Sequence, residues 1–195
     1  MMVLVIGGSG SGKSAYAEGL ACSLAEREGT EKYYLAAMQI FDQEDERRVA
    51  RHRALRKGKG FLTIEQPVQI EKALCKMETG KKTVLLECIS NLTANEMFSG
   101  SQTFSEAQAI TQTRVRKTVE TVELIRKGIA QIKRETNHLI VVSNNVFEDG
   151  IVYDRTTMDY LSAMGRINRQ LVAWADQAVE IVAGIPVPIA CGSQI

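Results

Sequence analysis

The stretch GGSGSGKS at residues 7–14 constrains the fold of this chain more than any other feature of its sequence. It fits the pattern G-x-x-x-x-G-K-[ST], in which a loop wraps its backbone N–H groups around a phosphate, with the fixed positions at Gly7, Gly12, Lys13 and Ser14. Glycine suits such a loop because it has no side chain and reaches positive φ without strain. The apolar run at 3–6 precedes the loop, and apolar residues at helical spacing follow it over 15–28. The loop therefore lies between a predicted strand and a predicted helix.

Lys13 and Ser14 carry the chemistry of this loop. We expect the Lys13 ammonium to contact the β and γ phosphates of a nucleoside triphosphate, and the Ser14 hydroxyl to bind Mg²⁺. The helix that begins here directs the positive end of its dipole at the same anion. The alternative interpretation is a glycine turn without a ligand, and the predicted strand and helix on either side favour the phosphate loop.

Apolar runs alternate with helical patterns along the rest of the chain. Further strands are expected at 32–37, 83–87, 138–144 and 178–184. These runs are apolar through most of their length, as in strands covered on both faces. Between them, the spacing of apolar residues over 104–136 predicts one long helix, or two with a break near Gly128. The alternation predicts a three-layer α/β fold of the P-loop class, with a mainly parallel sheet and ligands at the carboxyl ends of the strands.

Length and composition favour a single cytoplasmic domain. With 195 residues, 45% of them hydrophobic, the chain can bury one core, so we expect residues 1–195 to form one nucleotide-binding domain. The formal net charge of +1 disfavours a surface built to bind nucleic acid or a membrane. The four cysteines lack the close spacing of a zinc ribbon or a redox pair, which is typical of reduced intracellular thiols. The apolar run at the start is far shorter than the ~18 residues of a membrane span.

The predicted strand TVLLE at 83–87 ends in an acid, Glu87. A carboxylate at the carboxyl end of a buried strand can hold Mg²⁺ directly or through water. The alternative is a solvated acid without a ligand. Together with the phosphate loop, this position makes Glu87 and Ser14 the candidate ligands of one Mg²⁺ ion.

A basic segment, RRVARHRALRKGKG at 47–60, contains one of the two histidines of the chain. A helix is predicted from near Asp42 to near Lys57, because acids occupy what would be its first turn. A spacing of four residues places three side chains on one outward face of this helix, those of Arg48, His52 and Arg56.

Neighbouring guanidinium groups would keep the His52 imidazole neutral near pH 7, because a further positive charge beside them is unfavourable. A neutral imidazole is the form that can attack a nucleotide phosphorus, and the arginines would hold the phosphate chain. Two other interpretations stay open. The segment could be a solvated basic helix with an incidental histidine, or a nucleic-acid patch, although it lacks aromatic residues that stack on bases.

The chain resembles, over almost its whole length, the family of bifunctional adenosylcobinamide kinases and adenosylcobinamide-phosphate guanylyltransferases of cobalamin biosynthesis. Besides the phosphate loop, the resemblance rests on YLAAMQIFDQE at 34–44, RVARH at 48–52, IEQP at 64–67, LLECISN at 85–91, VVSN at 141–144, GIV at 150–152, GRINRQL at 165–171 and VEIVAGIP at 179–186. The element R-[VI]-x-x-H behind the loop is the most specific of these. Its histidine is guanylylated in this family, which implies that His52 is a nucleophile here.

The resemblance also implies substrates, cofactor and site residues. The substrates are adenosylcobinamide with GTP or ATP, and the cofactor is Mg²⁺. His52 and Lys13 are the implied catalytic residues, and the nucleotide is held by Gly7, Gly8, Ser9, Gly10, Ser11, Gly12, Lys13, Ser14, Ala36, Ala37, Met38, Arg53, Ala54, Leu55, Arg56, Glu65 and Glu87. The family forms a homotrimer with sites at the subunit interfaces, and we expect the same assembly.

The positions that depart from the family pattern include Asn145, Tyr153, Leu161 and Ser162. An acid is usual at the first, a proline at the second, and an Arg-Asp pair at the last two.

Two other functions stay open from the residues alone, a P-loop kinase of another small hydroxyl compound and a non-enzymatic nucleotide-dependent switch. Outside the site, His138 and Trp174 are expected to be structural.

Overall fold

The computed structural model describes residues 1–39, 47, 50, 53–54, 56–98, 110–147, 150–151 and 153–191. The strands are β1 (Met2–Gly7), β2 (Glu31–Ala36), β3 (Leu62–Glu65), β4 (Lys82–Glu87), β5 (His138–Asn144), β6 (Gln177–Val182) and β7 (Ile185–Cys191). The helices are α1 (Lys13–Glu28), the 3₁₀ helix η1 (Ile70–Lys76), α3 (Ile89–Phe98), α4 (Ile110–Glu135) and α5 (Arg155–Trp174).

The seven strands form one sheet in the order β3-β2-β4-β5-β1-β6-β7. Every pairing is parallel except that of β6 with β7, which is antiparallel. The predicted α/β fold with a mainly parallel sheet is therefore confirmed. Because β1 lies inside the sheet between β5 and β6, the loop that follows it emerges between the carboxyl ends of its two neighbours.

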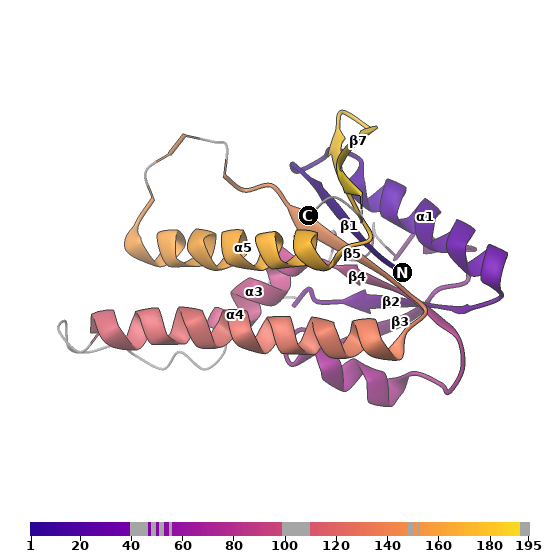
Figure 1. Cartoon of the computed structure of the whole chain (residues 1–195), viewed down its shortest axis with the longest axis horizontal. Helices are drawn as coiled ribbons and strands as arrows, with labels where there is room; N and C mark the ends of the chain where they lie inside the picture. Colours follow the sequence, from indigo (N-terminus) through magenta and orange to yellow (C-terminus); the bar gives the residue numbers. More distant parts are fainter. Residues whose placement is uncertain are drawn as a thin grey trace.

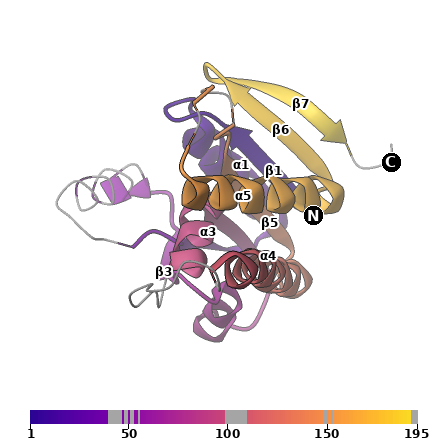
Figure 2. The ribbon, with the colours of Figure 1, turned by 90° about the vertical axis from the view of Figure 1, so that its left-hand side faces the viewer.

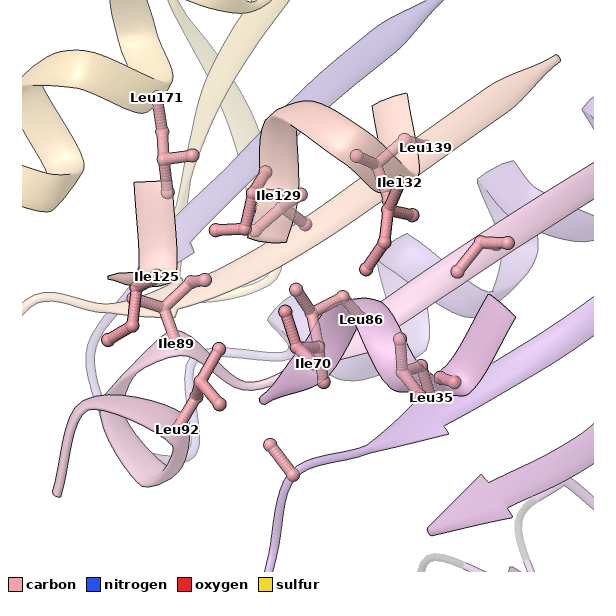
Figure 3. Packing of buried hydrophobic residues seen from close by; sticks show 14 of the residues in the cluster. Leu35, Ile70, Leu86, Ile89, Leu92, Ile125, Ile129, Ile132, Leu139 and Leu171 are labelled. Atoms are coloured by element: carbon pink, nitrogen blue, oxygen red, sulfur yellow. The ribbon is translucent and has the colours of Figure 1, made fainter. Parts of the chain in front are cut away.

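Helices cover both faces of the sheet. Ala17, Ala21 and Leu24 of α1 pack on one face against apolar side chains of the central strands. On the other face, α4, α5, α3 and η1 enclose a larger core (Figures 1 and 3), which includes Leu35, Ile70, Leu86, Ile89, Leu92, Ile125, Ile129, Ile132, Leu139 and Leu171. The three layers leave the carboxyl edge of the parallel strands free to carry a site.

The long α4 is continuous through Gly128, so the alternative of two helices with a break there is wrong. A Cβ at Gly128 would lie 2.8 Å from the Ile70 Cγ2 methyl and 2.8 Å from Glu71 Oε2. Glycine is present because η1 passes against the helix at this point. The predicted residues 104–109 lie outside the part of the chain that the structure describes.

The strand predicted at 178–184 ends earlier, at Val182. Ala183 and Gly184 have φ angles of 49° and 82° and form the turn into β7, which pairs back along β6. The sequence patterns did not reveal β7 or β3. Both are edge strands, and β3 has a largely exposed burial pattern. With few buried side chains, such a strand lacks the apolar signal on which prediction depends.

His138 and Trp174 are structural, as predicted. His138 is buried at the start of β5, and its Nε2 lies 2.8 Å from Glu28 Oε2 at the end of α1. This contact lowers the pKa of the Glu28 carboxyl. Trp174 packs against the larger core, and the Arg126 guanidinium lies 5.8 Å from the centre of its ring.

Candidate active site

The phosphate loop connects β1 to α1 at the carboxyl edge of the sheet. Gly10 and Gly12 have φ angles of 73° and 92°, a conformation that glycine adopts without strain. The loop also lies close to β6, because a Cβ at Gly7 would be 2.9 Å from the Ile181 carbonyl oxygen. The glycines therefore allow both the tight turn and the close approach to the neighbouring strand.

Lys13 begins α1, and its side chain folds back over the loop. Its Nζ donates to the Gly8 carbonyl oxygen at 3.0 Å, and only 8% of the residue is exposed. Burial lowers the pKa of this ammonium, while the charges of Cys88 and Glu87 act in the opposite direction. The cation and the positive end of the α1 dipole thus meet at one place, which suits a polyphosphate.

Glu87 ends β4 and contacts the first turn of α1. The Ser14 hydroxyl donates to Glu87 Oε1, and the Tyr34 hydroxyl donates to Oε2 at 3.0 Å. The two residues predicted to bind Mg²⁺ are therefore in direct contact, although they are far apart in the sequence. Both provide hard oxygen atoms, which are the ligands that Mg²⁺ prefers.

Tyr34 is a site residue that the sequence patterns did not reveal. It is buried at the end of β2, and burial together with the negative charge of Glu87 raises the pKa of its phenol. The Arg56 guanidinium lies 3.4 Å from the centre of the Tyr34 ring, a cation–π contact. Tyr34 thus links the carboxylate beside the phosphate loop to the segment that follows His52.

The prediction that Arg56 lies on an outward-facing side of a helix is wrong, because the residue is buried. The residue is helical, as are the described residues Arg47, Ala50, Arg53 and Ala54, but only 7% of it is exposed. A guanidinium can be buried in this way because its flat, weakly hydrated surface stacks on an aromatic ring. Its Nη1 is buried and has no hydrogen-bond partner among the residues that the structure describes.

Further predicted nucleotide-binding residues, Ala36–Met38 and Glu65, lie at the carboxyl ends of β2 and β3. The Ala37 backbone N–H donates to the Glu87 carbonyl oxygen at 3.0 Å, which places the segment Ala36 to Met38 beside β4. Glu65 ends β3, and Arg53 Nη2 donates to its Oε1. Arg53 and Glu65 are both exposed, so their charges are available to a ligand.

A cavity of about 650 Å³ opens beside these residues. We call it the basic pocket, and its lining consists of Arg53, Ala54, Arg56, Lys57, Gly58, Gly60, Phe61 and Thr63. Lys59, in the same segment as these lining residues, forms an ion pair with the buried Glu18 of α1. The structure thus brings the described nucleotide-binding candidates to one edge of the sheet. His52, Leu55 and Arg48 lie outside the described residues.

Of the positions that depart from the family pattern, Asn145 contacts the phosphate loop and the other three lie in or just before α5. The Asn145 backbone N–H donates to the Gly7 carbonyl oxygen at 3.0 Å, and its side chain donates to Glu180 Oε1 at 3.2 Å. Leu161 and Ser162 are part of α5, and Tyr153 precedes the Asp154 that caps this helix. Asn145 is therefore in direct contact with the loop.

The chain is similar to known proteins over nearly its whole length. A family model described as cobinamide kinase / cobinamide phosphate guanyltransferase matches residues 3–189. The bifunctional adenosylcobalamin biosynthesis protein CobU of Escherichia coli K12 is 29% identical over 97% of this chain and 99% of that protein. CobU of Salmonella typhimurium LT2 is 28% identical over the same shares, and CobP of Pseudomonas aeruginosa is 24% identical over 97% of each chain.

Among solved structures, an ATPase domain superposes with a TM-score of 0.46 at 12% identity, over 92% of this chain and 68% of that one. None of the helices in the described ranges combines the length and the apolar character needed to span a membrane. The match over nearly the whole chain shows that the protein belongs to the cobinamide kinase / cobinamide phosphate guanylyltransferase family and is a bifunctional enzyme of adenosylcobalamin biosynthesis.

Proposed function

We propose that His52 carries the guanylyl group from GTP to the phosphorylated cobinamide through a covalent intermediate. The observation that carries this proposal is the chain of contacts from Ser14 through Glu87 and Tyr34 to Arg56. It joins the phosphate loop to Arg56, which follows the histidine by four residues in the sequence. A triphosphate held at Lys13 would then extend toward Arg56, whose buried cation favours an anion.

In the guanylyl transfer, the His52 imidazole attacks the α-phosphorus of GTP. The nitrogen–phosphorus bond forms as the bond from the α-phosphorus to the bridging oxygen breaks, and pyrophosphate leaves. A phosphate oxygen of the adenosylcobinamide phosphate then attacks the same phosphorus, releases the imidazole and gives adenosylcobinamide-GDP. Two displacements in sequence are the pattern of nucleophilic catalysis. We place the guanosine in the basic pocket, with Arg53 and Glu65 at its edge.

In the kinase step, the γ-phosphoryl group of ATP or GTP passes to the side-chain hydroxyl of adenosylcobinamide. Lys13 would hold the β and γ phosphates, and the loop N–H groups would surround them. Ser14 and Glu87 fit a Mg²⁺ ion, because two hard oxygen ligands meet beside the lysine. Such an ion supplies charge neutralisation on the phosphate oxygens. The Tyr34 hydroxyl keeps one Glu87 oxygen engaged and so orients the other.

The test of the covalent step is incubation with GTP labelled at the α-phosphate, followed by intact-mass analysis. The wild-type protein is expected to gain one guanylyl group on His52, and the label is expected to be lost in mild acid but retained in base. His52→Ala is expected to gain none while it still phosphorylates adenosylcobinamide. A label that persists in His52→Ala would place the nucleophile elsewhere in the chain.

We propose in addition that the enzyme works in the cytoplasm as a homotrimer. The free cysteines in the described part of the chain include the buried Cys88 and the exposed Cys75, neither of them in a disulfide. Reduced thiols are typical of the cytoplasm. The trimer rests on the family resemblance.

A further inference from the structure

A second cavity, of about 530 Å³, lies on the other side of the phosphate loop. We call it the hairpin pocket. Its lining comes from the phosphate loop, from the end of β5 and from the β6–β7 turn, and consists of Gly8–Ser11, Asn145, Val146 and Glu180–Ala183. Neither the phosphate contacts nor the guanylyl transfer proposed above uses Asn145, Val146 or the β6–β7 turn.

The strand order places the two cavities on opposite sides of the loop. The hairpin pocket borders β6, which is adjacent to β1 and about 4.8 Å from it. The basic pocket borders β3, four strand spacings away in the other direction, or about 19 Å. Figure 2 shows the β6–β7 hairpin and β3 toward opposite ends of the molecule. A triphosphate that crosses the loop from the basic pocket therefore points its terminal phosphate toward the hairpin pocket.

The contact of Lys13 with the loop also lies on the side of the hairpin pocket. Its Nζ donates to the carbonyl oxygen of Gly8, and Gly8 is part of the lining of the hairpin pocket. Because the loop lysine contacts the β and γ phosphates, a γ-phosphate held by Lys13 would lie against the loop, whose residues 8–11 also line this pocket. In phosphoryl transfer the attacking and leaving oxygens are in line, so the acceptor must approach from the side opposite the nucleoside.

Among the lining residues that the structure describes, Glu180 is the one with a carboxylate. Its Oε1 accepts from Asn145 Nδ2 at 3.2 Å, and no other residue in the described ranges donates to it. Its second oxygen is therefore free to accept a proton. Around it the lining is apolar at Val146 and Val182, and Val182 is 53% exposed. The pocket combines an apolar wall with an oriented proton acceptor.

We propose that the hairpin pocket takes the alcohol arm of the cobinamide and that Glu180 is the general base of the kinase step, a proposal that rests on the nucleotide orientation given above. The alcohol oxygen attacks the γ-phosphorus, the bond to the β–γ bridging oxygen breaks, and the nucleoside diphosphate leaves. The alcohol proton passes to the free Glu180 oxygen and from there to solvent. The pocket accommodates the arm, and the macrocycle stays outside its mouth. Asn145 is a positioning residue that holds the carboxylate.

Glu180→Gln tests the base directly, because it keeps the size and the hydrogen bond to Asn145 but cannot take the proton. The expected result is a fall in kinase kcat of roughly a hundredfold, with the KM for ATP within about twofold of the wild-type value. Guanylylation of the protein by labelled GTP is expected to be unchanged. His52→Ala is the matched control. It is expected to keep the kinase kcat and to lose guanylylation of the protein.

Val182→Trp tests the pocket itself and does not depend on the behaviour of Glu180→Gln. Added bulk at the mouth is expected to raise the KM for cobinamide by roughly tenfold without changing the KM for ATP. Ile189→Trp, at an exposed apolar residue of β7 outside the pocket, is the control for a new surface tryptophan. Asn145→Ala is expected to lower kinase kcat severalfold, and to have no further effect in a Glu180→Gln background.

Three results would overturn the proposal. If Glu180→Gln folds and keeps the wild-type kinase kcat, Glu180 is not the general base. A Val182→Trp protein whose KM rises for ATP and not for cobinamide assigns the pocket to the nucleotide. A Glu180→Gln protein that loses both reactions equally shows a shared or structural role. Failure of His52→Ala to block guanylylation contradicts the covalent step alone, so the two proposals fail separately.

Discussion

At the scale of single residues, the site depends on buried polar contacts between segments that are distant in sequence. Tyr34 donates to Glu87 and carries the Arg56 guanidinium on its ring, so one side chain orients both a candidate metal ligand and a candidate phosphate ligand. Tyr33, the preceding residue, points to the other face of the sheet, where its hydroxyl contacts Glu31.

Tyr34→Phe removes the hydroxyl and keeps the aromatic ring. We expect the Mg²⁺ concentration for half-maximal kinase activity to rise by about tenfold, because the Glu87 carboxylate loses the donor that orients it. Unfolding free energy is expected to fall by about 1 kcal/mol, the usual contribution of one hydrogen bond. Titration of activity with Mg²⁺ and urea denaturation measure the two effects.

Tyr33→Phe is the matched control for this substitution. It removes a neighbouring buried hydroxyl that also makes hydrogen bonds, to Glu31 and from the Glu78 backbone. We expect a similar loss of stability with no change in the Mg²⁺ requirement. Equal shifts of the Mg²⁺ requirement in both variants would show that Tyr34 acts through stability alone.

At the scale of elements, the packing of α4 on η1 depends on a residue without a side chain. Gly128 lies in the middle of α4, where glycine is normally destabilising relative to alanine by about 1 kcal/mol. Here it faces Ile70 of η1, with no space for a Cβ. Ile70 is almost completely buried, so its methyl group cannot move aside freely.

Gly128→Ala is therefore expected to destabilise the protein by about 1–3 kcal/mol, the usual cost of overpacking, in spite of the better helix propensity of alanine. Gly19→Ala in α1 is the control, because a Cβ there has no neighbour within 4 Å. That variant is expected to gain roughly 0.5–1 kcal/mol. Thermal or urea unfolding gives both values, and a stabilised Gly128→Ala protein would contradict the contact with η1.

At the scale of the whole molecule, the arrangement of strands places two cavities around one phosphate loop. The loop follows β1 inside the sheet, so it is reached from the β2–β3 side and from the β6–β7 side. With the nucleotide placed as proposed above, one bound triphosphate would present its α-phosphorus on one side of the loop and its γ-phosphorus on the other.

The homotrimer is the prediction that belongs to this scale. The calculated chain mass is 21.5 kDa, and light scattering after gel filtration is expected to give about three times that value, as the family resemblance implies. The measurement is made at several protein concentrations, with and without GTP. A mass that stays at that of one chain under all these conditions would contradict the trimer and any site shared between subunits.

The sequence by itself determined the features that are encoded locally. The phosphate loop with its strand and helix, the central parallel strands and Glu87 at a strand end were all predicted, because glycine spacing and apolar periodicity act over short stretches. The family resemblance added the expected nucleophile at position 52 by matching motifs rather than geometry.

Only the tertiary structure decided which of these residues meet. Arg56 was predicted to face solvent and instead lies buried on Tyr34, because an aromatic face from another strand is available to it. The contact of Asn145 with Glu180 joins β5 to β6 across the end of β1. Helical and strand periodicity describe one element at a time, whereas these contacts arise when distant elements pack together, which is why the hairpin pocket and its carboxylate were found only in the folded chain.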